Sequence, residues 1–172
     1  MNLQSTDFEI FGQAPRFALD RDAVAERWKA LQREAHPDRF AAADAATQRK
    51  AMQWSVRINE AYQRLKDPLK RAAYLCELNG VSIGAEDNTA MPAQFLMQQM
   101  EWRETLEEAS GAEALERLAD ETADTKREML KAATVLADEK ADYAALAQTV
   151  RALMFVERFE HDVQARLEQL GQ

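Results

Sequence analysis

The tripeptide His36-Pro37-Asp38 places an imidazole close to a carboxylate, with a proline between them. Such a pair can exchange protons with a substrate, but acid–base catalysis on a small molecule also needs a cleft, which a loop between two helices does not supply. The same groups on a fixed turn can instead dock on a partner protein. The simplest alternative is a helix stop, with Asp38 as a local cap. Because a specified tripeptide occurs by chance in about two per cent of chains of this length, the surrounding sequence has to decide.

Cysteine and histidine are scarce, and this limits the available chemistry. The single cysteine, Cys76, and the two histidines, His36 and His161, provide neither an internal disulfide nor a tetrahedral zinc site. The motifs GxxxxGKS, GxxxxGKT, GxGxxG, GxSxG and HExxH are absent from the sequence. We therefore expect no cofactor and no enzyme activity, and we interpret Cys76 as a small buried hydrophobe. The alternative, a small enzyme that uses Cys76 with a histidine, predicts that Cys76→Ser abolishes an activity.

A second functional pattern lies between Pro92 and Ala109. With about 100° between successive residues, one stripe of the expected helix carries the predicted core side chains Phe95, Trp102, Leu106 and Ala109. The opposite side carries apolar residues interleaved with carboxylates, namely Leu96, Met97, Met100, Glu101, Glu104, Glu107 and Glu108. Exposed apolar anchors rimmed by charges are typical of a protein-binding surface, and methionine suits an adaptable contact. The pattern alone equally allows both faces to be buried in a wider bundle.

Two long helices are expected to position the tripeptide at the end of a hairpin. Asp20 can cap the first helix, and Pro37 ends it because proline lacks an N–H and disfavours helical backbone in the preceding residue. The second helix is expected from about Thr47 to Lys66, antiparallel to the first. Asp67 is expected to cap a short helix, PLKRAAYLCEL, that has Pro68 at its first position and ends at Asn79-Gly80. In the first helix, one apolar stripe predicted to be buried contains Val24, Trp28, Leu31 and Ala35.

The rest of the chain is also predicted to be helical. Residues 81–91 are small and polar without periodicity, and we interpret them as a linker between domains at 1–80 and 92–172. Three further helices are expected, from Pro92 to about Ala109, from about Ala112 to Ala137 and from about Ala141 to Leu170. Their short connections indicate an antiparallel three-helix bundle. Because good helix formers dominate and glycine and proline are few, the fold class is all-α.

Charge divides the chain into two parts. Residues 1–78 contain 13 Lys+Arg and 11 Asp+Glu, whereas residues 79–172 contain 9 and 19. In the first helix, Lys29 and Arg33 lie on a face that points toward His36, and Arg27 lies elsewhere on the exposed side. Between Arg27 and Arg71 basic residues outnumber acidic ones, and this local excess of positive charge favours an acidic protein surface as partner. It is weak for nucleic acid in a chain whose pI is about 4.9.

At this point the first half of the chain resembles a J domain along its whole length. The matching segments, in that family's order and spacing, are DFEIFG, AERWKALQREAHPDRF, INEAYQRLKDP and KRAAYL. The opening FEIFG, the loop LQREAHPDRF and the ending DPLKRAAYL are closer to HscB than to general J proteins. The resemblance implies docking on the DnaK-type chaperone HscA and stimulation of its ATPase. It also implies that His36, Pro37 and Asp38 are indispensable for stimulation, with electrostatic contact from Arg27, Lys29 and Arg33.

The second half resembles the C-terminal domain of HscB in QFLMQQMEWRETLEE and TVRALMFVERF. The resemblance implies that this domain binds the iron–sulfur scaffold protein IscU and delivers it to HscA. The positions that match the binding surface are Leu96, Met97, Met100, Glu101, Glu104, Glu108 and Phe155. Phe155 flanks the apolar stripe of its helix, so it is either surface or core. A bundle that serves another client, or that dimerises, is the alternative for this half.

The expected compartment follows from what the sequence lacks. Eukaryotic relatives carry an N-terminal cysteine zinc module and a mitochondrial leader, and neither is present, so we expect a bacterial member of the family. No run reaches the about 18 apolar residues of a membrane span, and the first residues do not read as an export signal. We therefore expect a cytoplasmic protein without a membrane partner. The two-domain interpretation needs no second copy, so we expect a monomer.

Overall fold

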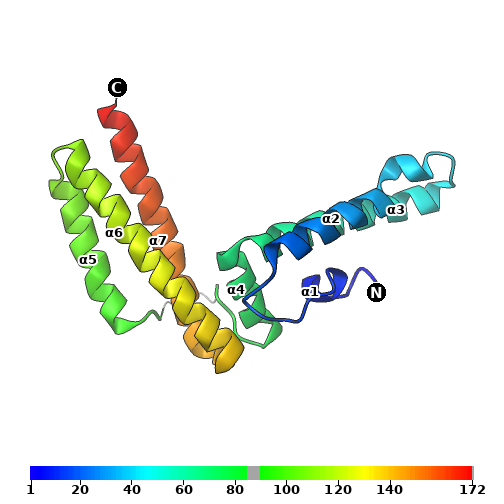
Figure 1. The fold of residues 1–172 in the computed structure, drawn as a ribbon, viewed down its shortest axis with the longest axis horizontal. Coiled ribbons are helices and arrows are strands. Elements are labelled where there is room, and N and C mark those ends of the chain that lie inside the picture. The colour runs from blue at the N-terminus through cyan, green and yellow to red at the C-terminus, as the bar shows by residue number, and fades with distance from the viewer. Residues whose placement is uncertain (85–89, 172) are drawn as a thin grey trace. The chain divides into compact units, whose positions relative to one another are not determined.

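The computed structural model describes residues 1–84 and 90–171. Within them every helix or strand assignment is helical, which confirms the all-α prediction, and no helix among them is long and apolar enough to cross a membrane. The chain divides into two compact units, Met1–Leu75 and Cys76–Gln172 (Figure 1). The expected linker at 81–91 includes residues 85–89, which lie outside the described residues.

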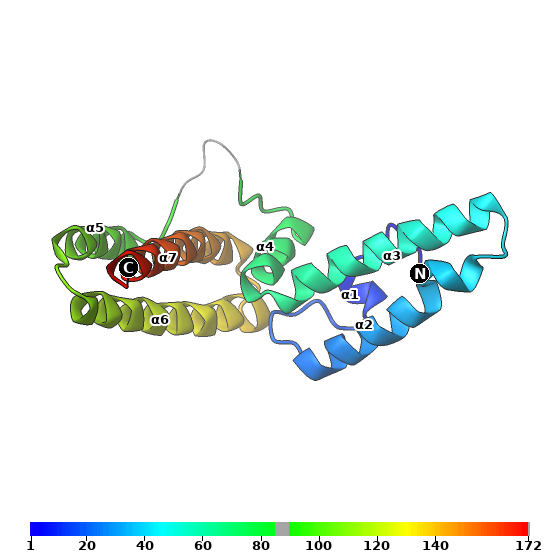
Figure 2. The same cartoon turned by 90° about the horizontal axis from the view of Figure 1, so that it is seen from above.

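The first unit is built around a hairpin of two helices (Figures 1 and 2). A short helix α1 (Asp7–Ile10) precedes α2 (Arg21–Ala35), a 3-10 turn η1 (Pro37–Phe40) and α3 (Ala45–Lys66), and α4 (Pro68–Leu78) begins in this unit. Asp20 caps α2 as predicted, because its carboxylate accepts the N–H groups of Asp22 and Ala23. The helix α3 begins two residues earlier than expected, because Asp44 accepts the Thr47 N–H at 2.7 Å and thereby becomes its cap. The Asp44 carboxylate accepts hydrogen bonds from the side chain and the backbone of Thr47, and these bonds lower the pKa of the Asp44 carboxyl.

Packing between α2 and α3 combines apolar and polar contacts. Val24 and Leu31 of α2 are buried, together with Ile58 of α3. The Trp28 ring stacks on Tyr62 with 4.6 Å between centroids, and its Nε1 donates a hydrogen bond to Asn59 Oδ1 at 3.0 Å. Trp28 and Ala35, the other members of the predicted stripe, are half-buried. The stripe therefore faces the partner helix, and the hairpin presents its connecting loop at one end.

A buried carboxylate anchors α1 to the hairpin. Asp7 has no solvent exposure, and its oxygens lie 2.8 Å from Arg57 Nη1 and 2.5 Å from Arg64 Nε. Its backbone N–H donates to the Tyr74 hydroxyl at 3.1 Å. The Arg64 guanidinium also lies over the Tyr74 ring, 4.2 Å from the centroid. Asp7 thus connects α1 with α3 through its side chain and with α4 through its backbone N–H.

Replacing Asp7 with alanine is expected to lower the free energy of unfolding of the first unit by about 3–5 kcal/mol, because it leaves Arg57 and Arg64 charged without their buried partner. Urea denaturation followed by tryptophan fluorescence measures the loss, and hydrogen exchange of the α1 and α3 amides localises it. Glu9→Ala is the matched control, since Glu9 is an exposed acid on the same helix. A loss for Asp7→Ala no larger than that of the control would contradict the anchoring role.

The second unit is a bundle of three helices that run up, down and up (Figures 1 and 2). They are α5 (Ala93–Glu108), α6 (Ala112–Thr134) and α7 (Tyr143–Leu170), and a π-helical turn η2 (Val135–Glu139) follows α6. The prediction of a regular helix to Ala137 therefore differs from the structure. The last helix begins two residues later than expected, because Ala141 adopts a φ of 49° and Asp142 caps the helix by accepting the Ala145 N–H.

Aromatic rings fill the core of this bundle. Phe95 and Trp102 of α5 pack against Phe155 and Phe159 of α7, and the ring centroids lie between 5.4 and 5.9 Å apart. The pairs Phe95–Phe155 and Trp102–Phe159 advance together along the two helices, so α5 and α7 run parallel. The predicted core stripe of α5 is confirmed for Phe95 and Trp102, which are both buried.

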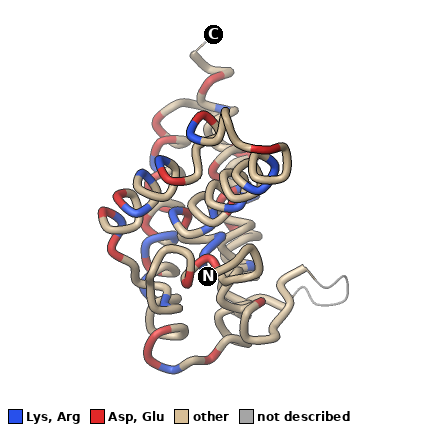
Figure 3. The backbone as a smooth tube through the Cα atoms, turned by 90° about the vertical axis from the view of Figure 1, so that its right-hand side faces the viewer, with Lys and Arg blue, Asp and Glu red and all other residues tan. Residues whose placement is uncertain are grey.

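Two arginines of α7 bind backbone carbonyls before α5 and at its C-terminal end. Arg151 is buried, and its guanidinium donates hydrogen bonds to the carbonyls of Ser82, Ile83 and Ala90. Arg166 donates to the carbonyls of Leu106 and Ala109, at the other end of α5. These bonds connect α7 with the segment that precedes α5 and with the C-terminal end of α5. Figure 3 marks where acidic and basic residues lie along the backbone.

Candidate functional site

The loop between α2 and α3, residues 36–44, presents the tripeptide to solvent; we call it the HPD loop. His36 ends α2 with a ψ of 130°, and Pro37 opens η1. The His36 Nδ1 accepts the backbone N–H of Asp38 at 3.2 Å, so the hydrogen-bond pattern assigns the proton of the neutral ring to Nε2. The side chains of His36 and Asp38 are 56% and 93% exposed. Both groups are therefore available to a partner.

The distance of 3.6 Å between His36 Nδ1 and Asp38 Oδ2 is too long for a hydrogen bond. The backbone bond from Asp38 therefore determines how the ring is held, and the carboxylate remains free to accept a hydrogen bond or pair with a cation of the partner. This arrangement suits recognition better than proton transfer between the two side chains.

Side chains outside the tripeptide fix the shape of the HPD loop. Gln48 of α3 donates from Nε2 toward the carbonyls of Phe40, Ala41 and Ala43, at 3.1–3.2 Å. Arg39 donates to the carbonyl of Glu34 in α2. Sequence reasoning missed Gln48, because no periodicity or spacing marks a glutamine that binds carbonyls five to eight residues before it.

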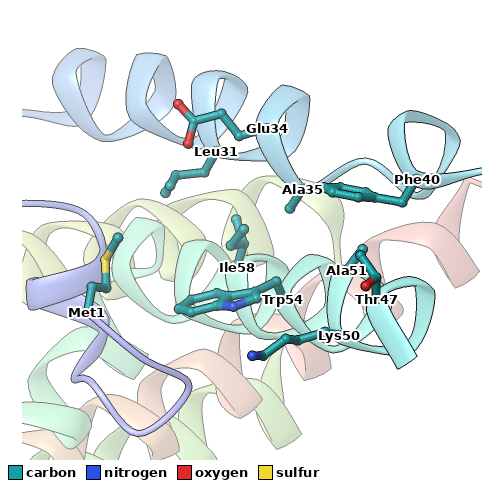
Figure 4. Close-up of a pocket in the computed structure, with 10 residues that line it drawn as sticks. All are labelled: Met1, Leu31, Glu34, Ala35, Phe40, Thr47, Lys50, Ala51, Trp54 and Ile58. Carbon is teal, nitrogen blue, oxygen red and sulfur yellow. The ribbon is translucent and has the colours of Figure 1, made fainter. Parts of the chain in front are cut away.

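A cavity of about 280 Å³ lies between α2 and α3 directly behind the HPD loop (Figure 4). Its walls are mostly apolar, and the residues that line it are Met1, Leu31, Glu34, Ala35, Phe40, Thr47, Lys50, Ala51, Trp54 and Ile58. Phe40 and Trp54 are only half-buried. Packing at this end of the hairpin is incomplete. The conformation of the HPD loop therefore depends largely on the hydrogen bonds of Gln48 and Arg39.

Two of the three basic residues singled out in α2 share a face with the loop. Lys29, Arg33 and His36 follow one another at helical spacings of four and three residues, and Lys29 and Arg33 are exposed. Arg27 is half-buried, and about 200° of helix rotation separates it from Lys29. The structure therefore joins Lys29 and Arg33 to the HPD loop and places Arg27 on another side of α2.

Cys76 occupies a buried position without a histidine contact among the described residues. Its Sγ lies 3.6 Å from the carbonyl oxygen of Tyr143, and burial raises the pKa of the thiol to about 11. A thiol with this pKa is almost fully protonated at neutral pH and is a poor nucleophile. Its surroundings support the interpretation of Cys76 as a small buried hydrophobe.

The side of α5 that faces away from the core is open to solvent. Leu96, Met97 and Met100 are 48%, 69% and 73% exposed. Six residues on this side are called the exposed face of α5: Leu96, Met97, Met100, Glu101, Glu104 and Glu108. These six residues fall within about 140° of the helix circumference. The possibility that both sides of α5 are buried within this chain is thereby excluded.

Phe155, the remaining residue of the expected scaffold-binding set, does not lie on the exposed face of α5. It is only 6% exposed and packs against Phe95 and Phe159 in the bundle core. The Arg103 guanidinium lies over its ring, 5.2 Å from the centroid. The sequence left open whether Phe155 is surface or core, and the structure places it in the core, beneath an arginine. Met154, the residue before it, is 44% exposed and was missed by sequence reasoning.

Comparison with protein families matches residues 91–164 to the family described as "HSCB C-terminal oligomerisation domain". The chain is 51% identical to a co-chaperone protein HscB homolog of Burkholderia multivorans, over 99% of this chain and 98% of that protein. It is 50% identical to the corresponding homolog of Burkholderia mallei, with the same coverage. The similarity therefore spans both units.

Solved structures agree with these matches. Chaperone HscB from Vibrio cholerae superposes with a TM-score of 0.81 at 35% identity, covering 96% of this chain and 99% of that one. Human co-chaperone protein HscB superposes with a TM-score of 0.88 at 23% identity, covering 96% of this chain and 84% of the human one. The human structure is similar in fold alone. The first unit therefore has the fold of a J domain, and the second that of the HscB C-terminal bundle.

Proposed function

The chain belongs to the HscB family of co-chaperones, and from this premise we propose that it stimulates the ATPase of the DnaK-type chaperone HscA and delivers the scaffold protein IscU to it. In this role it aids the assembly and transfer of iron–sulfur clusters. The observation that carries the proposal is the presence of two separate exposed surfaces, the HPD loop in one unit and the exposed face of α5 in the other.

The HPD loop is the surface proposed to bind the chaperone. His36 and Asp38 offer an N–H donor and a carboxylate on a turn that Pro37 and Gln48 hold in place. Lys29 and Arg33 add positive charge on the adjoining face of α2, which suits an acidic surface on the ATPase domain. Arg27 lies on another side of α2, so we expect its contribution to be smaller.

The exposed face of α5 is the surface proposed to bind the scaffold. Leu96, Met97 and Met100 provide apolar area for burial, and Glu101, Glu104 and Glu108 orient a partner that carries complementary charge. Because α5 is already a helix packed in the bundle, little backbone conformational entropy is lost when a partner binds. Phe155 contributes from beneath this region rather than as a freely exposed contact.

Delivery follows if one chain binds HscA and IscU at the same time. A scaffold held by the second unit is present at high effective concentration near a chaperone held by the first. We propose that the protein acts in this way as a cytoplasmic monomer, as an adaptor without enzyme activity of its own, and without nucleic acid or membrane partners. Sedimentation measurements at increasing protein concentration test the monomeric state.

Steady-state ATPase measurements test the delivery model. Scaffold and co-chaperone together are expected to stimulate HscA by more than the sum of their separate effects, because each positions the other on the chaperone. The assay uses purified HscA, IscU and the full chain, alone and in combination, and a pull-down tests each pairwise contact. Strictly additive rates would contradict delivery, even if both partners bind.

A further inference from the structure

A groove of about 360 Å³ runs along the seam between α5 and α7, next to the exposed face of α5. Its apolar residues are Leu106, Phe155 and Phe159, and its charged residues are Arg103, Glu107, Arg158 and Asp162. Arg103 and Arg158 lie at the Phe155 end. Glu107 and Asp162 each follow four residues later on their parallel helices, so the other end is acidic.

This groove continues the apolar surface of α5. Leu96, Met100, Arg103 and Glu107 follow one another at spacings of four, three and four residues, which places them on one stripe of the helix. On α7, the exposed Met154 lies four residues before Arg158. The two arginines therefore stand beside apolar side chains from both helices.

Arg103 and Arg158 differ from most of the basic residues of this acidic unit. Others are engaged with neighbours in the chain: Arg117, Lys126, Arg127 and Lys131 pair with carboxylates, and Arg151 and Arg166 bind carbonyls. Within the part of the chain that the structure describes, Arg103 and Arg158 have neither an ion pair nor a hydrogen bond from the guanidinium, and both are exposed. Two available guanidinium groups beside apolar area make this a site for a carboxylate.

The position of Arg103 also determines access to Phe155. Its guanidinium covers the ring at 5.2 Å, and the ring is otherwise part of the core. When Arg103 turns to bind a carboxylate, the edge of the Phe155 ring that lines the groove becomes open to an apolar side chain. Binding of the charge and burial of the apolar group are thus coupled through one side chain.

We propose that the α5–α7 groove binds a segment of the scaffold cargo in which a carboxylate lies next to an apolar side chain. The carboxylate pairs with Arg103 and Arg158, and the apolar side chain packs on Phe155 and Met100. A guanidinium offers a carboxylate two parallel hydrogen bonds, which gives orientation as well as affinity. The net negative charge of this unit otherwise repels an acidic segment, so the arginines also select where it binds. The inference rests on the proposed function, because it deepens the description of the same cargo contact.

The test is a charge reversal at both arginines. Calorimetry with IscU is expected to give a Kd at least about 10-fold weaker for Arg103→Glu/Arg158→Glu than for the unaltered chain, with a weaker dependence on salt. Arg103→Lys keeps the charge but loses the paired hydrogen bonds, so an intermediate Kd is expected. The matched control is Arg117→Glu/Arg127→Glu, which makes the same change in charge at exposed positions of α6. Circular dichroism verifies that each variant is folded.

The outcomes separate this inference from the proposed function. If the unaltered chain binds IscU and the reversal at the groove weakens binding no more than the control, the groove proposal is overturned while scaffold binding stands. If the unaltered chain does not bind IscU, the proposed function fails and the groove proposal fails with it. A third outcome is that the unaltered chain forms dimers, while the charge reversal gives monomers and leaves the affinity for IscU unchanged. The groove would then bind a second copy of the chain, and the proposal would be overturned.

Discussion

Replacing His36 with glutamine is expected to remove nearly all of the co-chaperone's stimulation of the HscA ATPase. The imidazole accepts the Asp38 N–H at Nδ1 and carries its proton on the far side of a rigid ring. Glutamine cannot reproduce both positions at once, because its side chain has an additional rotatable bond and a differently spaced acceptor and donor. The turn then loses the bond that holds Asp38, and the partner loses a positioned donor. Steady-state ATP hydrolysis at saturating co-chaperone measures the effect.

His161→Gln is the matched control for this experiment. His161 is an exposed histidine on α7, far in sequence from the HPD loop, so its replacement is expected to leave stimulation unchanged. Binding of IscU should be the same for both variants, because α5 is unaffected. Full stimulation by His36→Gln would contradict the role given to the loop, and equal losses in both variants would indicate a general effect of histidine replacement.

Changing Leu96 and Met100 together to serine is expected to weaken IscU binding by at least about 30-fold. A buried apolar anchor at the centre of an interface contributes about 1 kcal/mol or more, so the pair contributes about 2 kcal/mol or more. Both residues are exposed in the free protein, so the double variant should fold and should be as stable as the unaltered chain. Calorimetry or fluorescence anisotropy with labelled IscU measures the Kd.

The control for this change is Met52→Ser/Val56→Ser. These two residues are also an exposed apolar pair four positions apart on a helix, but they lie on α3 in the J domain. Their replacement is expected to leave the affinity for IscU unchanged. An unaltered Kd in the α5 variant would mean that the bundle recognises its client elsewhere, or that it serves another client.

Local signals in the sequence predicted most of the helices and their ends. Asp20 and Asp67 were identified as caps, and each accepts backbone N–H groups at its helix start. Gly80 follows the end of α4 with a φ of +79°, a conformation that glycine adopts without strain. Caps and helix stops are readable because donor, acceptor and backbone angle lie within a few residues of one another.

Contacts between distant segments were not predictable in the same way. Asp7 contacts Arg57 and Arg64, which lie 50 and 57 residues later in the sequence, and no periodicity marks an aspartate that will be buried. The face of α5 was predicted from one helix, but whether Phe155 is covered depends on Arg103 from another helix. After α6 the chain forms a π-helical turn and then a positive φ at Ala141, and no glycine or other local signal in the sequence marks either feature.

The hydrogen bonds of Arg151 have a consequence for how the chain can vary in length. One guanidinium holds carbonyls at residues 82 and 83 and at residue 90, so both ends of the intervening stretch are fastened to α7. The free-energy cost of closing a loop rises by only about 0.6 kcal/mol for each doubling of its length. Insertions there should therefore leave the register of α5 on α7 intact, which makes this a suitable position for an epitope or a reporter domain, and a place where relatives can differ in length without losing the bundle.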